Sequence, residues 1–123
     1  MEKKDVIPIT SIAYQAPADG APAPKLRRKL IHGNEIAQLS KALASKTRQQ
    51  ILAFLKEEPM DVSTLANRLG QTEANVSAQV QILQKAGLVI STYKPGNHGV
   101  RKVCEPAVDI IEIVLHSNGA EDE

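Results

Sequence analysis

The sequence predicts one mainly α-helical domain that carries a β-hairpin toward its C-terminal end. Between residues 60 and 89, two segments with apolar residues at helical spacing are separated by Gly70. Residues 88–94 and 100–104 follow as two runs rich in β-branched side chains, with the turn-forming sequence PGNHG between them. The chain of 123 residues has room for one such domain of roughly 70 to 100 residues, with tails.

The two helical segments have clear start and stop signals. Asp61 and Thr72 are suited to the N-cap positions, because their short side-chain oxygens accept a bond from a free N–H of the first turn. Gly70 stands where the first helix needs a left-handed residue, and Gly87 closes the second helix. Two helices joined by a turn that contains glycine are typical of a helix-turn-helix unit. The apolar residues of these helices recur on one face: Val62, Leu65, Ala66 and Leu69, then Val76, Val80 and Leu83.

The outward face of the second helix carries small or hydrogen-bonding side chains. Such side chains allow a helix to enter the major groove of DNA and to contact base edges. An ordinary solvated helix also has a polar outer face, so this stretch alone leaves both interpretations open. The residues on this face are Glu73, Ala74, Asn75, Ser77, Ala78, Gln81 and Lys85.

Two further helices are predicted before this unit. Asn34 is suited to cap a helix over residues 35–43, and Ser45 to start another that Pro59 ends. Lys46 and Arg48 lie in the first turn of that second helix, where the helix dipole disfavours cations. A phosphate bound at the helix N-terminus would reverse this penalty, so we expect both residues to contact DNA phosphates.

Basic residues surround the predicted hairpin, and a hairpin directly after a recognition helix is the wing of a winged helix. Lys94, His98, Arg101 and Lys102 lie around its tip and sides. A hairpin packed on three helices with no role in DNA binding is the alternative. Residues 25–104 hold thirteen Lys and Arg against five acidic residues, a net charge of +8, which favours a polyanion as partner.

The two ends of the chain differ from this basic middle. Residues 1–30 are predicted to be a flexible arm rich in Pro and Ala that ends in a basic cluster, residues 31–104 to be the winged domain, and residues 118–123 to be a disordered acidic tail. Residues 105–117 are predicted to form a helix that begins at Pro106 and mediates dimerisation, because it is too apolar for the surface of a monomer. Its β-branched residues leave a strand as the minority interpretation, but Ile110 and Ile111 break the alternation expected of a half-buried strand.

Composition and motifs exclude several classes of protein. No apolar run approaches the roughly 20 residues of a membrane span, and the N-terminal residues lack the apolar region of a signal peptide. The single cysteine, Cys104, excludes an intrachain disulfide and fits the cytoplasm; we expect it to be packed rather than redox-active.

No catalytic or phosphate-binding motif is present, so we expect neither an enzyme nor a cofactor. Asp109, Glu112 and His116 would share one helix face, but such a stripe more often meets water than metal, and no metal site is predicted.

The segments ALASKTRQQILAFLK and DVSTLANRLGQTEANVSAQVQILQKAGLV, followed by the basic hairpin, resemble the ArsR/SmtB-like winged-helix transcriptional regulators. The resemblance covers residues 35–104 and implies a dimeric prokaryotic repressor that releases its operator when a metal or another signal binds. Metal-sensing members often carry a C-x-C motif in the first helix of the helix-turn-helix, where this chain has Asp61 and Ser63, which supply no thiolate. The resemblance implies that Thr72, Glu73, Ala74, Asn75, Ser77 and Ala78 face the bases.

We therefore expect a sequence-specific, homodimeric transcriptional repressor that binds double-stranded DNA. A segregation or architectural DNA-binding protein of the same fold is one alternative, and a winged helix used only for protein–protein contact is another. The sequence identifies no inducer. The residues expected to contact DNA are Thr72, Glu73, Ala74, Asn75, Ser77, Ala78 and Gln81 in the recognition helix, Lys46 and Arg48 in the earlier helix, and Lys94, His98, Arg101 and Lys102 in the wing.

Overall fold

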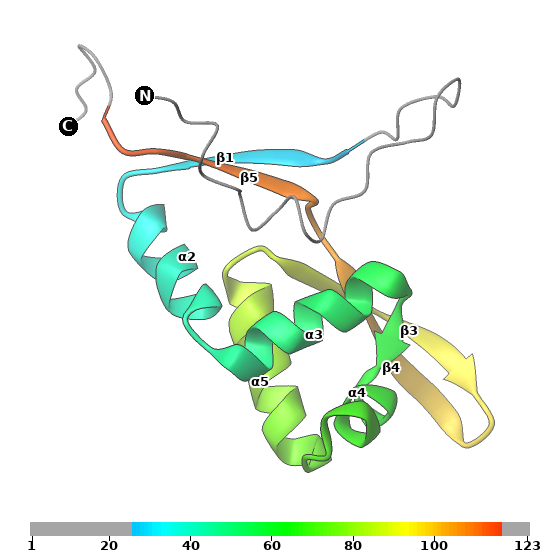
Figure 1. Cartoon of the computed structure of the whole chain (residues 1–123). Coiled ribbons are helices and arrows are strands. Elements are labelled where there is room, and N and C mark those ends of the chain that lie inside the picture. Colours follow the sequence, from blue (N-terminus) through cyan, green and yellow to red (C-terminus); the bar gives the residue numbers. More distant parts are fainter. Residues whose placement is uncertain (1–25, 117–123) are drawn as a thin grey trace, which may run out of the picture.

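The computed structural model describes residues 26–116, so the predictions for residues 1–25 and for the acidic tail lie outside the described residues. Helices predominate in the first two thirds of this range and strands in the last third (Figure 1). The elements are, in order, β1 (Arg28–His32), α2 (Glu35–Leu43), α3 (Lys46–Glu57), β2 (Met60–Asp61), α4 (Val62–Leu69), α5 (Glu73–Lys85), β3 (Val89–Gly96), β4 (Gly99–Pro106) and β5 (Ile110–Val114).

All four predicted helices are confirmed, and side-chain caps begin three of them. Ser45 accepts a bond from the backbone N–H of Arg48 at 3.2 Å, Asp61 from Thr64 at 2.8 Å and Thr72 from Asn75 at 3.1 Å. Asn34 occupies the N-cap position of α2, although its side chain makes no cap bond. Gly70 ends α4 with a φ of 66°, a left-handed conformation that glycine adopts at no steric cost.

The predicted hairpin is also confirmed, and its strands are longer than expected. β3 and β4 pair antiparallel from Val89 opposite Pro106 to Gly96 opposite Gly99, so most of the expected turn belongs to the ladder. The short strand β2 pairs with the other edge of β4, which gives a three-stranded sheet in the order β2-β4-β3. The strand that leads into α4 is therefore bonded directly to the base of the wing.

The prediction of a C-terminal helix over residues 105–117 is wrong. Pro106 ends β4 instead of starting a helix, and residues Ile110–Val114 form strand β5, which pairs in parallel with β1. β-branched side chains favour an extended backbone, and β1 supplies the hydrogen-bonding partner that this backbone needs. Residues 28–30 were predicted to end the flexible arm, but they belong to β1.

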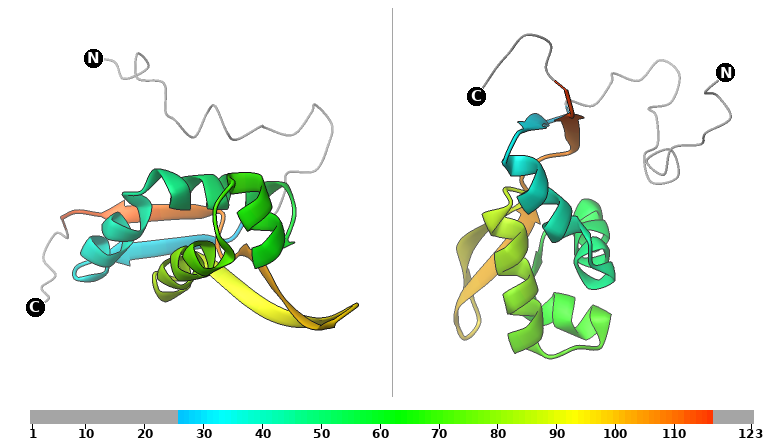
Figure 2. Two further views of the ribbon diagram at one scale, coloured as in Figure 1. Left: turned by 90° about the horizontal axis from the view of Figure 1, so that it is seen from below. Right: turned by 90° about the vertical axis from the view of Figure 1, so that its left-hand side faces the viewer.

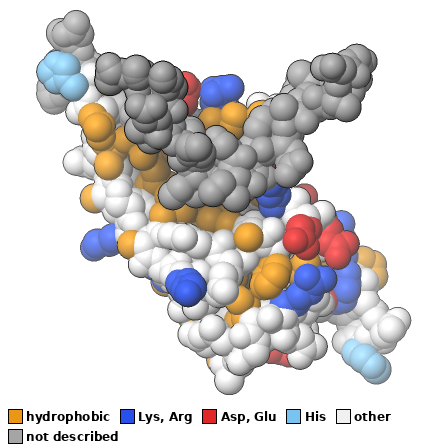
Figure 3. Space-filling view, viewed as in Figure 1, with side chains coloured by type: hydrophobic (Ala, Val, Ile, Leu, Met, Phe, Trp, Pro, Cys, Tyr) orange, Lys and Arg blue, Asp and Glu red, His pale blue; other side chains and the backbone are white. Residues whose placement is uncertain are grey.

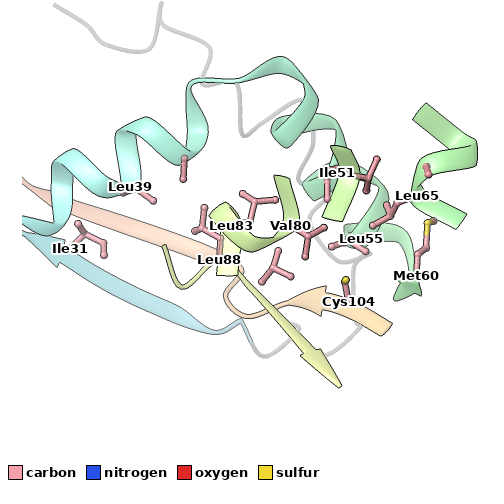
Figure 4. Close-up of a cluster of buried hydrophobic side chains, with 14 residues drawn as sticks. Ile31, Leu39, Ile51, Leu55, Met60, Leu65, Val80, Leu83, Leu88 and Cys104 are labelled. Carbon is pink, nitrogen blue, oxygen red and sulfur yellow. The ribbon is translucent and has the colours of Figure 1, made fainter. Parts of the chain in front are cut away.

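The buried core of the described residues contains no aromatic residue, in a chain that has only two Tyr, one Phe and no Trp. Figure 4 shows side chains from all four helices, the sheets and the segments between them meeting in one cluster. Ile31 of β1 is buried in this cluster, so the terminal sheet is attached to the helical domain. Cys104 is fully buried, and burial raises the pKa of its thiol, which agrees with a packed rather than a reactive side chain. The fully buried large residues are Leu39, Ile51, Leu55, Leu65, Leu83, Val76, Val80 and Cys104.

The two sheets divide the molecule into two ends. The parallel pair β1 and β5 lies beside α2 at one end, and the turn between α4 and α5 lies at the other (Figures 1 and 2). The β3–β4 hairpin projects from the body of the domain toward the end that carries α4. Among residues 26–116, no helix is long and apolar enough to cross a membrane.

Candidate nucleic-acid interface

The outer face of α5 is available to a partner. Val76, Val80 and Leu83 are buried against the rest of the domain, which turns the opposite side of the helix toward solvent. Seven of the predicted site residues are thereby brought together at the start and along the exposed side of this helix. Thr72, Glu73, Ala74, Asn75, Ala78 and Gln81 are exposed, and Ser77 is half-buried.

A hollow of about 500 Å³ lies between the start of α4, the start of α5 and the wing. The hollow brings Arg101 and Lys102 of the wing next to the first turn of α5. Its lining consists of Asp61, Val62 and Ser63, of Glu73, Ala74 and Ser77, and of Val100, Arg101 and Lys102.

Asp61 joins the wing to the helix-turn-helix. Its Oδ1 caps α4, and its Oδ2 lies 3.1 Å from Nη1 of Arg101. The bonds donated by Thr64, assisted by the charge of Arg101, hold the pKa of Asp61 below its usual range. The side chain of Arg101 is nevertheless 53% exposed, so the guanidinium that anchors the wing also faces solvent.

Glu73 is the one acidic residue predicted at the interface, and it has a partner inside the protein. The hydroxyl of Ser63 donates to Oε2 of Glu73 at 3.1 Å, which joins the first turns of α4 and α5. Ser63 therefore serves here as a donor to a carboxylate. Within residues 26–116, no three His, Cys, Asp or Glu side chains are grouped so that they could hold a metal ion.

The remaining basic residues of the predicted site fall into two groups. Lys46 is exposed at the start of α3, and Lys94 and His98 are exposed in the outer part of the wing. Arg48 is instead half-buried and bonded within the protein. Its guanidinium donates from Nε to the carbonyl of Ala42 at 2.7 Å, from Nη2 to that of Lys41 at 2.9 Å, and from Nη1 to Oε1 of Gln79 at 2.6 Å.

Sequence reasoning missed two residues of this region, Gln71 and Gln79. Gln79 donates to Oδ1 of Asn75 at 3.4 Å, and the side-chain amide of Asn75 donates to Oε1 of Gln71. Asn75 and Gln79 lie one turn apart on α5, and Gln71 precedes the Thr72 cap at the same spacing of four positions. This regular spacing of carboxamides was the signal in the sequence that could have identified them.

The exposed helix, the turn that precedes it and the basic hairpin beside it define a winged helix-turn-helix protein. A family model described as a helix-turn-helix domain matches residues 43–92. The HTH-type transcriptional regulator CmtR of Mycobacterium bovis is 41% identical over 59 residues, which are 48% of this chain and 50% of CmtR. The chain thus spans about half the length of this relative.

Solved structures give the same result. The first 100 residues of Mb0332 from Mycobacterium bovis, a possible ArsR-family transcriptional regulator, form a homodimeric winged helix-turn-helix DNA-binding domain in solution. That structure has 31% identity and a TM-score of 0.54, and the match covers 60% of this chain and 65% of that one. A crystal structure of a fragment of the same length from Mycobacterium bovis also has 31% identity and a TM-score of 0.54, with 60% of this chain and 75% of that chain covered. The chain belongs to the ArsR/SmtB-like family of winged helix-turn-helix transcriptional regulators.

Proposed function

We propose that the chain is a sequence-specific DNA-binding protein that represses transcription as a homodimer in the cytoplasm. The observation that carries this proposal is the joint exposure of the α5 face and the basic wing around one hollow. Membership of a family of transcriptional regulators supports it. The net charge of +8 over residues 25–104 supplies the attraction to a polyanion.

The α5 helix would lie in the major groove. Ala74 and Ala78 have short side chains that permit close approach and can contact thymine methyl groups, whereas Asn75 and Gln81 can hydrogen-bond to base edges. Thr72, Glu73 and Ser77 complete the set of base-facing residues. Glu73 already accepts a bond from Ser63, which holds its carboxylate at the start of α5, and its other oxygen could accept from cytosine.

Phosphate contacts would come from both sides of this helix. Lys46 lies at the start of α3, and Lys94, His98, Arg101 and Lys102 lie in the wing. Contacts with phosphates fix the position of the protein on the duplex but carry no sequence information. Arg48 would act mainly through its bonds to α2 and α5, which hold the helices in their relative positions.

A second copy of the chain would cover the terminal sheet. Leu30 of β1 is 54% exposed, Ile113 of β5 is 46% exposed and the adjacent Leu115 is 83% exposed, although all three are large aliphatic residues. Figure 3 shows apolar side chains in the upper part of the view, where Figure 1 places α2, β1 and β5. Within residues 26–116, β1 and β5 pair only with each other, and a twofold axis would pair identical outer edges of two copies. The homodimeric state of the Mb0332 domain supports a dimer, and the exposed aliphatic residues are the reason for its assignment to this sheet.

The sheet lies away from the α4–α5 turn, so a dimer formed there leaves the recognition helices free (Figure 1). The twofold axis would present two recognition helices to successive major grooves, about 34 Å apart. Binding of the first half-site then makes the second contact intramolecular, which raises the overall affinity.

The test is selection of bound fragments from a random DNA pool, followed by binding measurements with Asn75→Ala and Ser77→Ala variants. We expect a palindromic consensus, and we expect the variants to lose roughly 1–3 kcal/mol of discrimination per lost base contact while non-specific affinity is retained. Lys56→Ala, which alters the end of α3 away from the proposed phosphate contact at Lys46, is the control. If selection recovers no consensus, or if both variants weaken binding to every sequence equally, the proposed base reading by α5 is wrong.

A further inference from the structure

A chain of side-chain hydrogen bonds runs along α5 and begins and ends on α3. Nη1 of Arg48 donates to Oε1 of Gln79 at 2.6 Å, and Nε2 of Gln79 donates to Oδ1 of Asn75 at 3.4 Å. Nδ2 of Asn75 then donates to Oε1 of Gln71, and Nε2 of Gln71 donates to the hydroxyl of Thr47 at 3.4 Å. Three carboxamides are therefore linked between two neighbouring residues of α3.

We propose that Arg48 and Gln79 are positioning residues that fix the orientation of the Asn75 amide, so that Asn75 reads an adenine in each half-site. The inference rests on the proposed function, because it concerns how the same surface recognises DNA. Neither Arg48 nor Gln79 needs to touch a base in order to act in this way.

The donor-to-acceptor direction of this chain of hydrogen bonds is set by Arg48, where it begins. A guanidinium has only N–H donors, so Gln79 turns its oxygen toward Arg48 and its NH₂ group toward Asn75. Asn75 in turn presents its oxygen to Gln79 and its NH₂ group to Gln71. A flip of any one amide would place two donors or two acceptors against each other, so Arg48 determines the orientation of all three.

Arg48 is itself held in place. The carbonyls of Lys41 and Ala42, at the end of α2, accept bonds from Nη2 and Nε at 2.9 Å and 2.7 Å. Two fixed carbonyls and one glutamine oxygen orient the guanidinium plane, and Arg48 is half-buried between the helices. The direction of the hydrogen-bond chain is thus anchored, through Arg48, to backbone carbonyls of α2.

The consequence for Asn75 is a defined pair of free groups. An amide oxygen has two lone pairs and an amide nitrogen has two N–H groups. The bonds to Gln79 and Gln71 use one of each, so one lone pair and one N–H group of Asn75 remain for a base. Asn75 is exposed on the outer face of α5, and its backbone N–H is also fixed by the Thr72 cap. Adenine offers its N6 amino group and N7 in the major groove, the pattern that one acceptor and one donor of an asparagine match. Guanine offers two acceptors there and fits less well.

Gln79→Glu tests the inference most directly. An ionised glutamate keeps the bond from Arg48 but cannot donate, so the Asn75 amide is expected to turn its NH₂ group toward residue 79. The matched control is Gln84→Glu, which adds the same charge to the same helix. The oxygen of Gln84 accepts a bond from Ser91 at 3.1 Å, a bond that a carboxylate retains. Gln79→Met, which removes both bonds without adding charge, is the second variant.

The measurements are NMR of the Asn75 side-chain NH₂ group in the free homodimer and binding to oligonucleotides in which each adenine of the selected site is replaced in turn. We expect the NH₂ resonances to shift in Gln79→Glu and Gln79→Met but not in Gln84→Glu. We expect discrimination at one adenine to fall by roughly 5- to 100-fold in both Gln79 variants, with little change in binding to random DNA. Thermal unfolding confirms that each variant is folded.

Two outcomes separate the possible failures. If the wild type itself shows no sequence preference, the proposed function fails, and adenine reading fails with it. If the wild type is sequence-specific but the Gln79 variants keep its base preference, or if the Asn75 resonances do not move, only the positioning role of Arg48 and Gln79 is overturned.

Discussion

Arg27 and Asp109 pair with each other across 82 positions of sequence, through both side chains and backbone. The carboxylate of Asp109 accepts from the backbone N–H of Arg27 at 2.8 Å, from Nε at 3.0 Å and from Nη2 at 3.1 Å. The carbonyl of Arg27 accepts in return from the N–H groups of Asp109 and Ile110 at 2.9 and 3.0 Å. The parallel ladder of β1 and β5 begins at the next pair, Arg28 and Ile110, so this contact sets its register.

Replacement of Asp109 by Asn is expected to lower the free energy of unfolding at neutral pH. The bonds from Arg27 lower the pKa of Asp109, so its carboxylate stabilises the fold above its unfolded pKa of about 3.9. This stabilisation is lost as the pH falls through the still lower folded pKa. The difference between wild type and variant should therefore be full above about pH 5 and should shrink below about pH 4, as measured by denaturant unfolding across this range.

Glu112→Gln is the control for this experiment. Glu112 lies 3.8 Å from Arg28 and both side chains are more than half exposed, so its removal should change stability little at any pH. An Asp109→Asn variant with wild-type stability at pH 7 would show that the Arg27–Asp109 contact does not stabilise the terminal sheet.

Removal of the Asp61 side chain is expected to destabilise α4. Asp61→Ala loses the cap on Thr64 and the contact with Arg101, and the cap alone is worth about 1 kcal/mol. Asp61→Asn should retain most of this stability, because asparagine is also a good N-cap residue. Urea unfolding measures both variants, and equal losses in the two would show that the charge of Asp61, and not its cap, stabilises α4.

The exposed lysines on either side of α5 are expected to determine the salt dependence of DNA binding. Lys46→Ala and Lys94→Ala should weaken binding to all sequences and each reduce the slope of log affinity against log salt by about 0.9. Lys56→Ala removes a charge at the end of α3 away from Lys46 and should leave the slope unchanged. Fluorescence anisotropy over a salt series checks this, and unchanged slopes for both lysine variants would contradict the proposed docking.

Charged substitutions in the terminal sheet are expected to dissociate the dimer. Leu30→Glu and Ile113→Lys place a charge where a second copy would otherwise bury an aliphatic side chain, which stabilises by roughly 1.5–3 kcal/mol when fully buried. Light scattering should report monomers for these variants and a dimer for Val100→Glu, since Val100 is 70% exposed in the wing. Circular dichroism confirms folding. Folded variants that remain dimeric would place the interface elsewhere.

The local elements of this protein were determined by the sequence. Asp61, Thr72 and Gly70 act within one turn of the helices that they begin or end, so their effect is readable from neighbouring residues alone. The hairpin was equally predictable, because a turn sequence lies between two β-branched runs. These elements suffice for the winged helix-turn-helix and for the exposed face of α5.

The tertiary structure decided the conformation of residues 110–114 and the bonding of Arg48, because both depend on partners in other elements. Residues 110–114 have a composition that suits a strand or a buried helix, and only pairing with β1, some eighty positions earlier, selects the strand. Arg48 was predicted to contact phosphate because it lies in the first turn of α3, where the helix dipole disfavours cations. The carbonyls at the end of α2 and the oxygen of Gln79 became its partners only when three helices packed together. Hydrogen bonds between segments far apart in sequence follow from that packing and leave no periodic signal in the chain.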